Sequence, residues 1–457
     1  MNPGATTSPL RCHLSLAQYA RPVAPSALHE GSGFFTAKRV AHESLKNHPK
    51  RWKWRLEWLG QIAVEKFAGL LPGPLVFRLG EALGGLAWYF MPFRQRVIFR
   101  NLRIAFYGEY DLPALRQMAR ETFRRTAANL LSALHSTRLS AAAVDALVTV
   151  ENQDLLVDAL TRSPGLVLLP SHMGNWELLT RINHKFPPGH KIGAFYRPLN
   201  NRLLDARVLA QRELDGTRLF SKRDSLHIVT GFLRDGGIIG ILADQRVGKQ
   251  GERVRFFGRL TRASPLPSLM IRRSRSEVLA MSLITEAPGK WKIRYHRVRQ
   301  PFKTEDCMMA IEAALKASPA DVFWFQERWK LYVSGKVSLR DWLGPDTLGA
   351  GKPHRALLWL AGAPAGWRVP ESWIHPDVIY EMVLAPGQPK PAWLTGAEIL
   401  HTAPPSSDRD ALRKSIAEID LAAGLPIDYI LTCQATKALE KAARKESIPL
   451  ISLTPNP

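Results

Sequence analysis

The chain has 457 residues, of which 46% are hydrophobic, so it is long enough to bury a core and too long for one ordinary domain. Its 63 Lys and Arg against 40 Asp and Glu give a formal net charge of +23, which favours anionic partners such as lipid phosphates, acidic proteins or nucleic acid. Residues 351–457 hold 11 charges of each sign, so the whole excess lies in residues 1–350. Three cysteines without CxxC spacing argue against a disulfide framework or a zinc knuckle, and the start lacks the pattern of a secretory signal.

Residues 1–45 are rich in Pro, Ser, Gly and Ala without periodicity, which predicts a mobile leader. Residues 46–112 instead mix aromatic, basic and apolar side chains. The longest uncharged run there, Ala82 to Phe93, is shorter than the roughly 18 apolar residues that a membrane-spanning helix needs. This pattern predicts helices lying in a membrane interface, and a buried helical hairpin is the alternative. The side chains expected at headgroup level are Trp52, Trp54, Trp58, Trp88 and Tyr89, and those expected on lipid phosphates are Arg94, Arg96, Arg100 and Arg103.

Residues 113–140 carry apolar positions at helical spacing, and apolar runs typical of strands follow. Helical segments separate the first three of these runs, so the sequence predicts an α/β sandwich with a mixed or mostly parallel sheet. The predicted strands are 165–170, 191–196, 236–243, 276–284 and 290–298.

The chemistry concentrates where the first of these strands ends, in LPSHMGNWELL. Side chains at such a strand end project into the crevice of an α/β sheet. Glu177 lies five residues after His172, about 140° away on a regular helix, so the two can meet only if His172 sits on the turn before the helix. In that geometry the carboxylate accepts from one imidazole nitrogen and leaves the other free to take a proton from a hydroxyl. This arrangement predicts base catalysis.

A single HxxxxE spacing is a weak signal, and a histidine that caps or packs is the alternative. Ser171 adjoins His172 without a GxSxG elbow, so we interpret it as a cap or turn residue and not as a nucleophile. The sequence contains no HExxH, P-loop or GxGxxG motif, so metal-dependent hydrolysis and nucleotide chemistry have no support from motifs.

Six ordered blocks resemble the lipid A biosynthesis acyltransferase family, within the wider HxxxxD/E lysophospholipid acyltransferases. They are SHMGNWE, GAFYRPLNN, SKRDSL, GGIIGILADQ, RFFGR and WFQERWK, and the likeness runs from about Arg51 to Lys330. The resemblance implies a glycerol-3-phosphate acyltransferase-like α/β sandwich over residues 113–343. It also implies that His172 is the general base and Glu177 its partner.

The same resemblance implies further roles. Arg197 would bind phosphate of the acceptor, beside a basic block formed by Lys222 and Arg223; a solvated surface arginine is the alternative. Asp244, Gln245, Phe256 and Phe257 would shape the pocket and an acyl channel. The alternatives are a turn after a strand for Asp244 and Gln245, and core packing for the two phenylalanines.

The implied reaction is direct transfer of a fatty acyl group from an acyl-carrier protein or coenzyme A thioester to a lipid hydroxyl, without a metal or bound cofactor. The acceptor would be a lipid A precursor or a related phosphorylated glycolipid, and phosphatidylinositol mannoside or a lysophospholipid stays open. The enzyme would act at the cytoplasmic face of the bacterial inner membrane, on a surface rich in anionic lipid.

Residues 344–353 contain Gly and Pro typical of a linker, and residues 354–457 predict a small α/β unit without a motif. If that unit were catalytic, the chain would be a glycosyltransferase or another nucleotide-binding protein, and His172 would be dispensable. A membrane-binding protein without activity is the second alternative. Nucleic-acid binding is not expected, because the basic excess is interleaved with apolar segments and no reader motif occurs.

Overall fold

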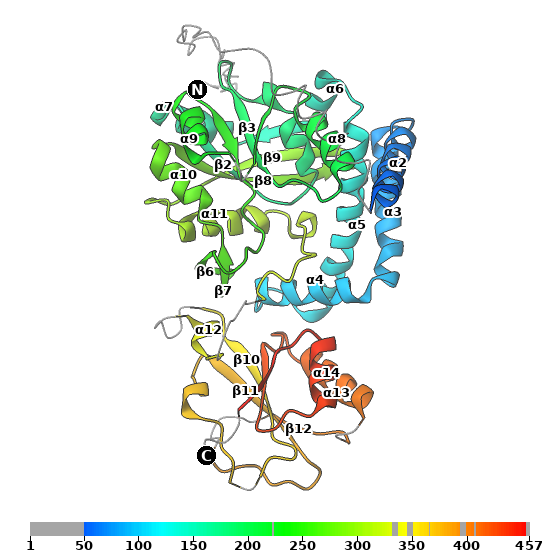
Figure 1. The fold of residues 1–457 in the computed structure, drawn as a ribbon, viewed down its shortest axis with the longest axis vertical. Coiled ribbons are helices and arrows are strands. Elements are labelled where there is room, and N and C mark those ends of the chain that lie inside the picture. Colours follow the sequence, from blue (N-terminus) through cyan, green and yellow to red (C-terminus); the bar gives the residue numbers. More distant parts are fainter. Residues whose placement is uncertain are drawn as a thin grey trace, which may run out of the picture.

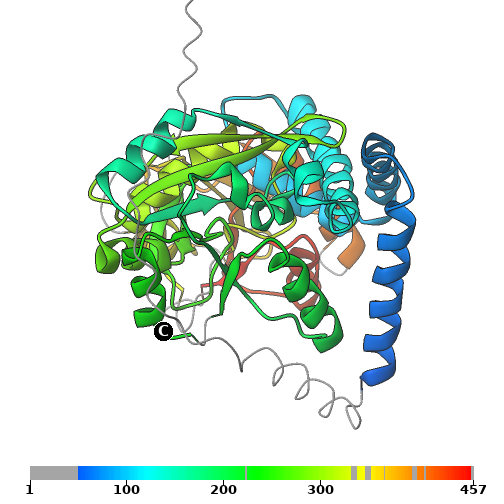
Figure 2. The ribbon, with the colours of Figure 1, turned by 90° about the horizontal axis from the view of Figure 1, so that it is seen from above.

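The computed structural model describes residues 50–221, 224–330, 337–344, 351–364, 366–393, 399–405 and 408–453, so the predicted leader lies outside it. Four helices open the described chain, and α2 and α3 form the outer edge of the molecule, with α5 between them and the central sheet (Figures 1 and 2). Proline occupies the first turn of α3, α4 and α5, where the missing N–H costs nothing. The helices are α2 (Arg51–Ala68), α3 (Gly73–Phe90), α4 (Pro92–Ala105) and α5 (Leu112–Ser136).

Glycines bring α3 close to α5. A Cβ added at Gly80 would lie 2.5 Å from the Cα of Ala128, and one at Gly84 would lie 2.4 Å from the carbonyl oxygen of Phe123. Larger side chains at these two positions would force the helices apart. The α3–α5 pair is therefore fixed by small residues, and α3 turns other side chains outward.

The side chains expected to anchor a membrane divide into two groups. Trp52 and Tyr89 are 68% and 65% exposed, whereas Trp54 is buried and Trp88 packs edge-on against Phe123 in the core. The expectation that the arginines of α4 face lipid phosphates is wrong, because protein groups already bind all four. Their acceptors are the Phe325 carbonyl for Arg94, Glu446 for Arg96, the Ile427 carbonyl for Arg100 and Asp420 for Arg103.

Among the described residues, no helix is long and apolar enough to cross a membrane. The apolar side chains that α2 and α3 expose are instead spread over their outer faces. The largest on the two helices are Trp52, Leu56, Leu59, Phe67, Leu75, Leu83, Leu86, Tyr89 and Phe90, and Leu70 is exposed in the turn between them.

A seven-stranded sheet in the order β1-β9-β8-β2-β5-β3-β4 forms the centre of the larger unit. Five neighbours from β8 to β4 run parallel, while β9 pairs antiparallel with β8 and parallel with β1. The sheet is therefore mixed. Its strands are β1 (Val148–Glu151), β2 (Leu166–Pro170), β3 (Ile192–Tyr196), β4 (Arg218–Ser221), β5 (Ile238–Gly240), β8 (Glu277–Ala287) and β9 (Lys290–Arg297).

Helices cover this sheet, and α7 and α11 pack on β8 and β9 while α10 packs on β2. A separate antiparallel hairpin, β6 (Glu252–Phe256) with β7 (Arg259–Ala263), projects toward the C-terminal unit (Figure 1). The helices and short 3₁₀ turns are α6 (Ala141–Asp145), α7 (Gln153–Arg162), η2 (Trp176–Thr180), η3 (Asn183–Lys185), α8 (Arg202–Arg212), α9 (Leu226–Arg234), α10 (Leu266–Ser274), α11 (Thr304–Lys316) and η4 (Pro319–Asp321).

The α/β class predicted from the sequence is confirmed, and all five predicted strands are present. The sequence reading missed β1, β4 and the β6–β7 hairpin, because these runs are short and rich in charged or polar residues. Their sequences are VTVE, RLFS, ERVRF and RLTRA. Such strands depend on pairing with neighbours more than on their own propensity.

A second sheet of five parallel strands follows, in the order β12-β11-β10-β13-β14. Apolar side chains on its two faces form two core clusters, one against α13 and α14 and one against α12 and tryptophan-bearing loops. The elements of this C-terminal unit are α12 (Arg340–Leu343), β10 (His354–Trp359), η5 (Glu371–Trp373), β11 (Val378–Leu384), β12 (Leu400–Thr402), α13 (Arg409–Leu421), β13 (Tyr429–Thr432), α14 (Lys437–Lys445) and β14 (Leu450–Ser452).

Candidate active site

His172 and Asp244 come together because β2 and β5 are parallel neighbours. Leu168 pairs with Gly240, and the two chains leave the sheet at the same edge. His172 lies two residues beyond β2 and Asp244 four residues beyond β5. The carboxyl ends of parallel strands are where open α/β sheets bind ligands. Two residues 72 positions apart in the sequence are thus brought into contact.

Two hydrogen bonds join these residues. Asp244 Oδ1 lies 2.7 Å from Nδ1 of His172, and Asp244 Oδ2 accepts from the His172 backbone N–H at 3.1 Å. Because an ionised carboxylate can only accept, Nδ1 carries the proton and donates it. No described residue forms a hydrogen bond with Nε2, and the histidine side chain is 22% exposed while Asp244 is 7% exposed. Nε2 therefore has a lone pair available to take a proton.

Charges around the pair tune its basicity. Burial by itself would lower the pKa of His172, but the negative charges of Asp244 and, more weakly, Glu177 outweigh burial and raise it above its ordinary value. Burial opposes the ionised form of Asp244, and the histidine and its backbone N–H outweigh that penalty, so the pKa of Asp244 is lowered. A more basic imidazole is a better proton acceptor, provided that the pH keeps it neutral.

Glu177 does not bind the imidazole, so the expected direct pairing is wrong. His172 does sit on the turn before η2, and Glu177 lies in its first turn, as the spacing required. The carboxylate, however, accepts from Nε of Arg212 at 2.8 Å and from its Nη2 at 2.7 Å. The η2 segment is a tight 3₁₀ turn, and its glutamate faces the end of α8 while Asp244 already occupies Nδ1. The negative charge of Glu177 raises the pKa of His172, but the two side chains form no hydrogen bond.

Trp176 connects the two pairs. Its Nε1 donates to Glu177 at 3.2 Å, and its ring meets the His172 ring edge-on with centroids 5.5 Å apart. Phe323 also packs edge-on against the indole, with ring centroids 5.7 Å apart. The histidine is therefore walled on one side by aromatic rings, which keep its rotamer fixed.

The segment Val322–Trp329, which we call the strap, holds the backbone of the histidine turn. The N–H of Phe323 donates to the His172 carbonyl at 2.8 Å, and Val322 forms an antiparallel bridge with Met173. Gly174 has φ +57°, and a Cβ there would lie 2.3 Å from the Leu283 carbonyl oxygen. Glycine alone fits this turn, so the strap and the turn specify one position for the imidazole.

Arg328 of the strap is a buried cation near the pair. Its Nη1 donates to Thr261 Oγ1 at 2.8 Å, and its guanidinium carbon lies 4.6 Å from the centre of the Phe256 ring. Burial lowers the pKa of Arg328 to about 10, and the negative charge of Asp244 opposes this shift. Arg328 thus adds a positive field that helps Asp244 stay ionised.

The other predicted site residues are spread more widely. Arg197 directly follows β3 and is exposed, and Gln245 is half-buried next to Asp244. Phe256 and Phe257 are each 1% exposed and pack in an aromatic core, so a role in an acyl channel stays a prediction. Their ring neighbours are Phe106, Trp324 and Trp329. Lys222 and Arg223 lie outside the described residues.

Arg212 and Arg328 were missed as site residues by the sequence reading, and Asp244 was expected only to shape the pocket. Neither arginine could be paired from the local sequence, because their partners lie 35 residues or more away. The ADQ block after a strand pointed to Asp244, and the WFQERWK block contained Arg328 without indicating its role. Within the described part of the chain, no group of three or more His, Cys, Asp or Glu could hold a metal ion.

Comparison with known proteins identifies the family of the chain. A family model for bacterial lipid A biosynthesis acyltransferases matches residues 42–331, well over half of the chain. The lipid A biosynthesis palmitoleoyltransferase of Escherichia coli (strain K12) is 23% identical over 301 residues, which cover 64% of this chain and 95% of that protein. The lipid A biosynthesis lauroyltransferase of the same organism is 27% identical over 201 residues, covering 44% and 63%.

The matched segment contains the whole site from His172 to Arg328 and ends before the C-terminal unit. The chain therefore belongs to the bacterial lipid A biosynthesis acyltransferase family and is an O-acyltransferase.

Proposed function

We propose that this protein transfers a fatty acyl group from a thioester, on acyl-carrier protein or coenzyme A, to a hydroxyl of a lipid A precursor or a related phosphorylated glycolipid. The observation that carries the proposal is the His172–Asp244 pair, with Nε2 free among the described residues at the carboxyl edge of the sheet. Family membership supplies the lipid class. We further propose that the larger unit is a glycerol-3-phosphate acyltransferase-like sandwich.

In the proposed reaction His172 acts as general base. Nε2 takes the proton of the acceptor hydroxyl while its oxygen attacks the thioester carbonyl carbon. The tetrahedral intermediate collapses, the carbon–sulfur bond breaks, and the imidazolium returns its proton to the leaving thiolate. Asp244 holds Nδ1–H and stabilises the imidazolium that forms between the two steps. No covalent acyl-enzyme forms, and the residues present complete the proton transfer without a metal or bound cofactor.

The Glu177–Arg212 pair is suited to hold the acceptor. Arg212 keeps part of its guanidinium accessible, since its side chain is 25% exposed, and a planar guanidinium matches phosphate geometry. Burial by itself would lower the pKa of Arg212, but Glu177 outweighs it and raises the value, so the cation persists at every working pH. Arg197 follows β3 and is exposed, which supports a role in binding phosphate of the acceptor.

We propose that the outer faces of α2 and α3 bind the cytoplasmic face of the inner membrane. Both helices expose large apolar side chains, and α2 also exposes Arg51, Lys53 and Arg55. An apolar face flanked by cations is typical of helices that lie in the membrane interface and favour anionic lipid. A lipid acceptor would then be reached without leaving the bilayer surface.

The test is transfer of radiolabelled acyl groups by the intact protein on mixed vesicles. Acyl-carrier protein and coenzyme A thioesters are compared as donors, and a lipid A precursor, a phosphatidylinositol mannoside and a lysophospholipid as acceptors. We expect transfer to the lipid A precursor, and transfer about 10³-fold slower by His172→Ala at equal vesicle binding. Transfer to another acceptor alone would replace the proposed substrate, and activity retained by His172→Ala would remove the proposed base.

A further inference from the structure

Helix α4 carries polar side chains on two different faces, and each face binds a different part of the protein. Arg94 and Asn101 are seven residues apart and share one face, whereas Arg100 and Arg103 point to another side. All four form hydrogen bonds to backbone carbonyls or carboxylates far away in the sequence. Helix α4 thus lies between the strap and the C-terminal unit (Figure 1).

The first face of α4 holds the strap. Arg94 donates to the Phe325 carbonyl at 2.9 Å. Asn101, which is 3% exposed, donates to the carbonyls of Trp324 and Gln326 at 2.8 and 2.5 Å. Three consecutive strap carbonyls are therefore fixed by α4, directly after the residue whose N–H binds the His172 carbonyl.

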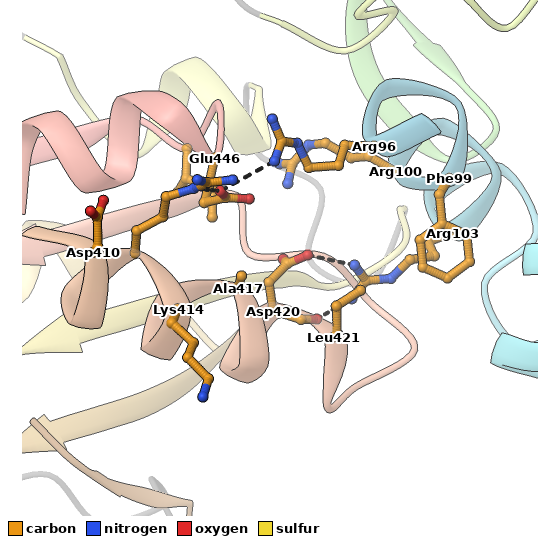
Figure 3. A pocket seen from close by; sticks show the side chains of 12 residues that line it. Arg96, Phe99, Arg100, Arg103, Asp410, Lys414, Ala417, Asp420, Leu421 and Glu446 are labelled. Carbon is orange, nitrogen blue, oxygen red and sulfur yellow. Dashed lines mark hydrogen bonds and ion pairs between the residues drawn. The ribbon is translucent and has the colours of Figure 1, made fainter. Parts of the chain in front are cut away.

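The second face of α4 binds the C-terminal unit. Arg103 is 1% exposed and donates to Asp420 Oδ2 at 2.6 Å and to the Ala423 and Gly424 carbonyls at 2.7 and 3.2 Å. These acceptors lie at the C-terminal end of α13, where unpaired carbonyls favour a cation. Arg100 donates to the Ile427 carbonyl at 2.7 Å. Figure 3 shows Arg103 reaching across to Asp420.

A second group of contacts joins the C-terminal unit to the hairpin that packs against the strap. Arg259 of β7 donates to Asp428 at 2.6 Å and to the Pro353 carbonyl at 2.6 Å. Asp428 is 7% exposed and also lies 3.7 Å from Arg100 of α4. Burial works against the ionised Asp428, but Arg259 and its neighbours outweigh it and hold the pKa of that carboxyl well below its usual range. One carboxylate thus ties α4 and the hairpin to the same unit.

Much of this interface is not filled by apolar packing. A cavity of about 430 Å³ separates α4 from α13 and α14, and its wall is lined mainly by charged side chains (Figure 3). Contacts between two units of one chain usually permit relative motion unless they are large and apolar. Here buried ion pairs fix the orientation of the C-terminal unit relative to α4. Removing one partner of such a pair is strongly destabilising, because the other charge is left buried without a partner.

We propose that the C-terminal unit is a brace for the active site, which acts through Arg103 and Arg100 of α4 on the strap that positions His172. Both arginines are positioning residues, since they touch neither the histidine nor the site of transfer. The activity readout rests on the proposed function, whereas the structural readout does not require any substrate.

The test uses full-length protein with Arg103→Gln, Arg103→Lys and Arg100→Gln, and Lys414→Gln as the matched control. Lys414 lines the same cavity, but its side chain is 78% exposed and it forms an ion pair with Glu418 of its own helix. Hydrogen exchange of residues 322–329 is measured together with kcat and KM. Exchange of β8 and β9 reports on the central sheet.

For Arg103→Gln we expect exchange of the strap to rise about tenfold and kcat to fall about tenfold at nearly unchanged KM, because small displacements of a positioned base cost rate. Arg103→Lys should recover part of both, and Lys414→Gln should match the original protein. Faster exchange in α13 with an unaltered strap and kcat would overturn the proposal. If Arg103→Gln does not fold, Arg100→Gln decides the question by the same readouts, with a smaller rise expected. If the original protein shows no transfer, the proposed function fails while the exchange experiment still decides the brace.

Discussion

In the part of the chain that the structure describes, two histidines each bind a buried aspartate, and only one of these pairs is arranged for chemistry. In the larger unit, His172 binds Asp244 at 2.7 Å and its side chain is 22% exposed. In the C-terminal unit, His354 binds Asp428 at 3.0 Å and both side chains are 7% exposed. Each pair lies at an end of parallel strands. The residue types and the distances are alike, so neither explains the difference.

The end of the sheet and the neighbouring charge separate the two pairs. His172 and Asp244 follow the carboxyl ends of β2 and β5, whereas His354 begins β10 and Asp428 directly precedes β13. Asp428 also forms an ion pair with Arg259, whose Nη1 lies 2.9 Å from Nδ1 of His354. Burial and this arginine lower the pKa of His354 despite Asp428, while Asp244 and Glu177 raise that of His172 against burial. A His–Asp pair is thus a base or a structural contact according to what else the carboxylate must bind.

The largest effect on the transfer rate is expected from His172→Ala, which removes the proposed base from the His172–Asp244 pair. Transfer should fall about 10³-fold, within the usual range for a general base. The matched control is His227→Gln, since His227 is exposed on α9, away from this site. Initial rates on vesicles measure both. Comparable losses in the two variants would mean that His172 acts through stability alone.

Asp244→Asn tests whether the carboxylate tunes the base. We expect about a 10²-fold loss, because the imidazolium loses its partner and the tautomer is no longer fixed. The original protein should lose activity as the pH falls through the raised pKa of His172, above 6.5. Without Asp244 that pKa drops, so the acid limb of kcat/KM should move to lower pH. An unmoved limb would show that another group titrates.

Glu177→Gln separates the observed geometry from the pairing expected by sequence spacing. If Glu177 acts through Arg212, Glu177→Gln should lower the transfer rate about tenfold. The double variant with Arg212→Gln should be only slightly slower than either single variant, because the two residues share one interaction. A loss as large as that of Asp244→Asn would instead make Glu177 the partner of the histidine during the reaction. Rates of the two single variants and the double variant decide between these outcomes.

The smallest effect sharpens the comparison without any substrate. Titration of the histidine ring signals by NMR should place His172 above the ordinary pKa of 6.5 and His354 below it. The linked stabilities then have opposite signs. The contribution of His172 is full below pH 6.5 and is lost as the pH rises through its folded pKa, whereas that of His354 is full above pH 6.5 and is lost as the pH falls through its folded pKa. Equal titration of both rings would contradict the assignment.

Local pattern was sufficient for the α/β class, for five strands of the central sheet and for the position of His172 at a strand end. Apolar runs such as LVLLP and YILT are hydrophobic enough to specify buried strands wherever they pair. The polar strands β4 and β7 could not be read in this way, because their pairing partners stabilise them.

The partners of the charged groups were decided only by the tertiary structure. The spacing of His172 and Glu177 suggested a local pair, but parallel packing of β2 on β5 placed Asp244 against the imidazole. In the same way the arginines of α4 looked suited to lipid phosphate, but the strap supplies the acceptor of Arg94 and the C-terminal unit supplies those of the other three. Hydrophobic periodicity is a local property of the sequence, whereas a charge binds whichever opposite group the fold brings within reach, and that choice is made across tens or hundreds of residues.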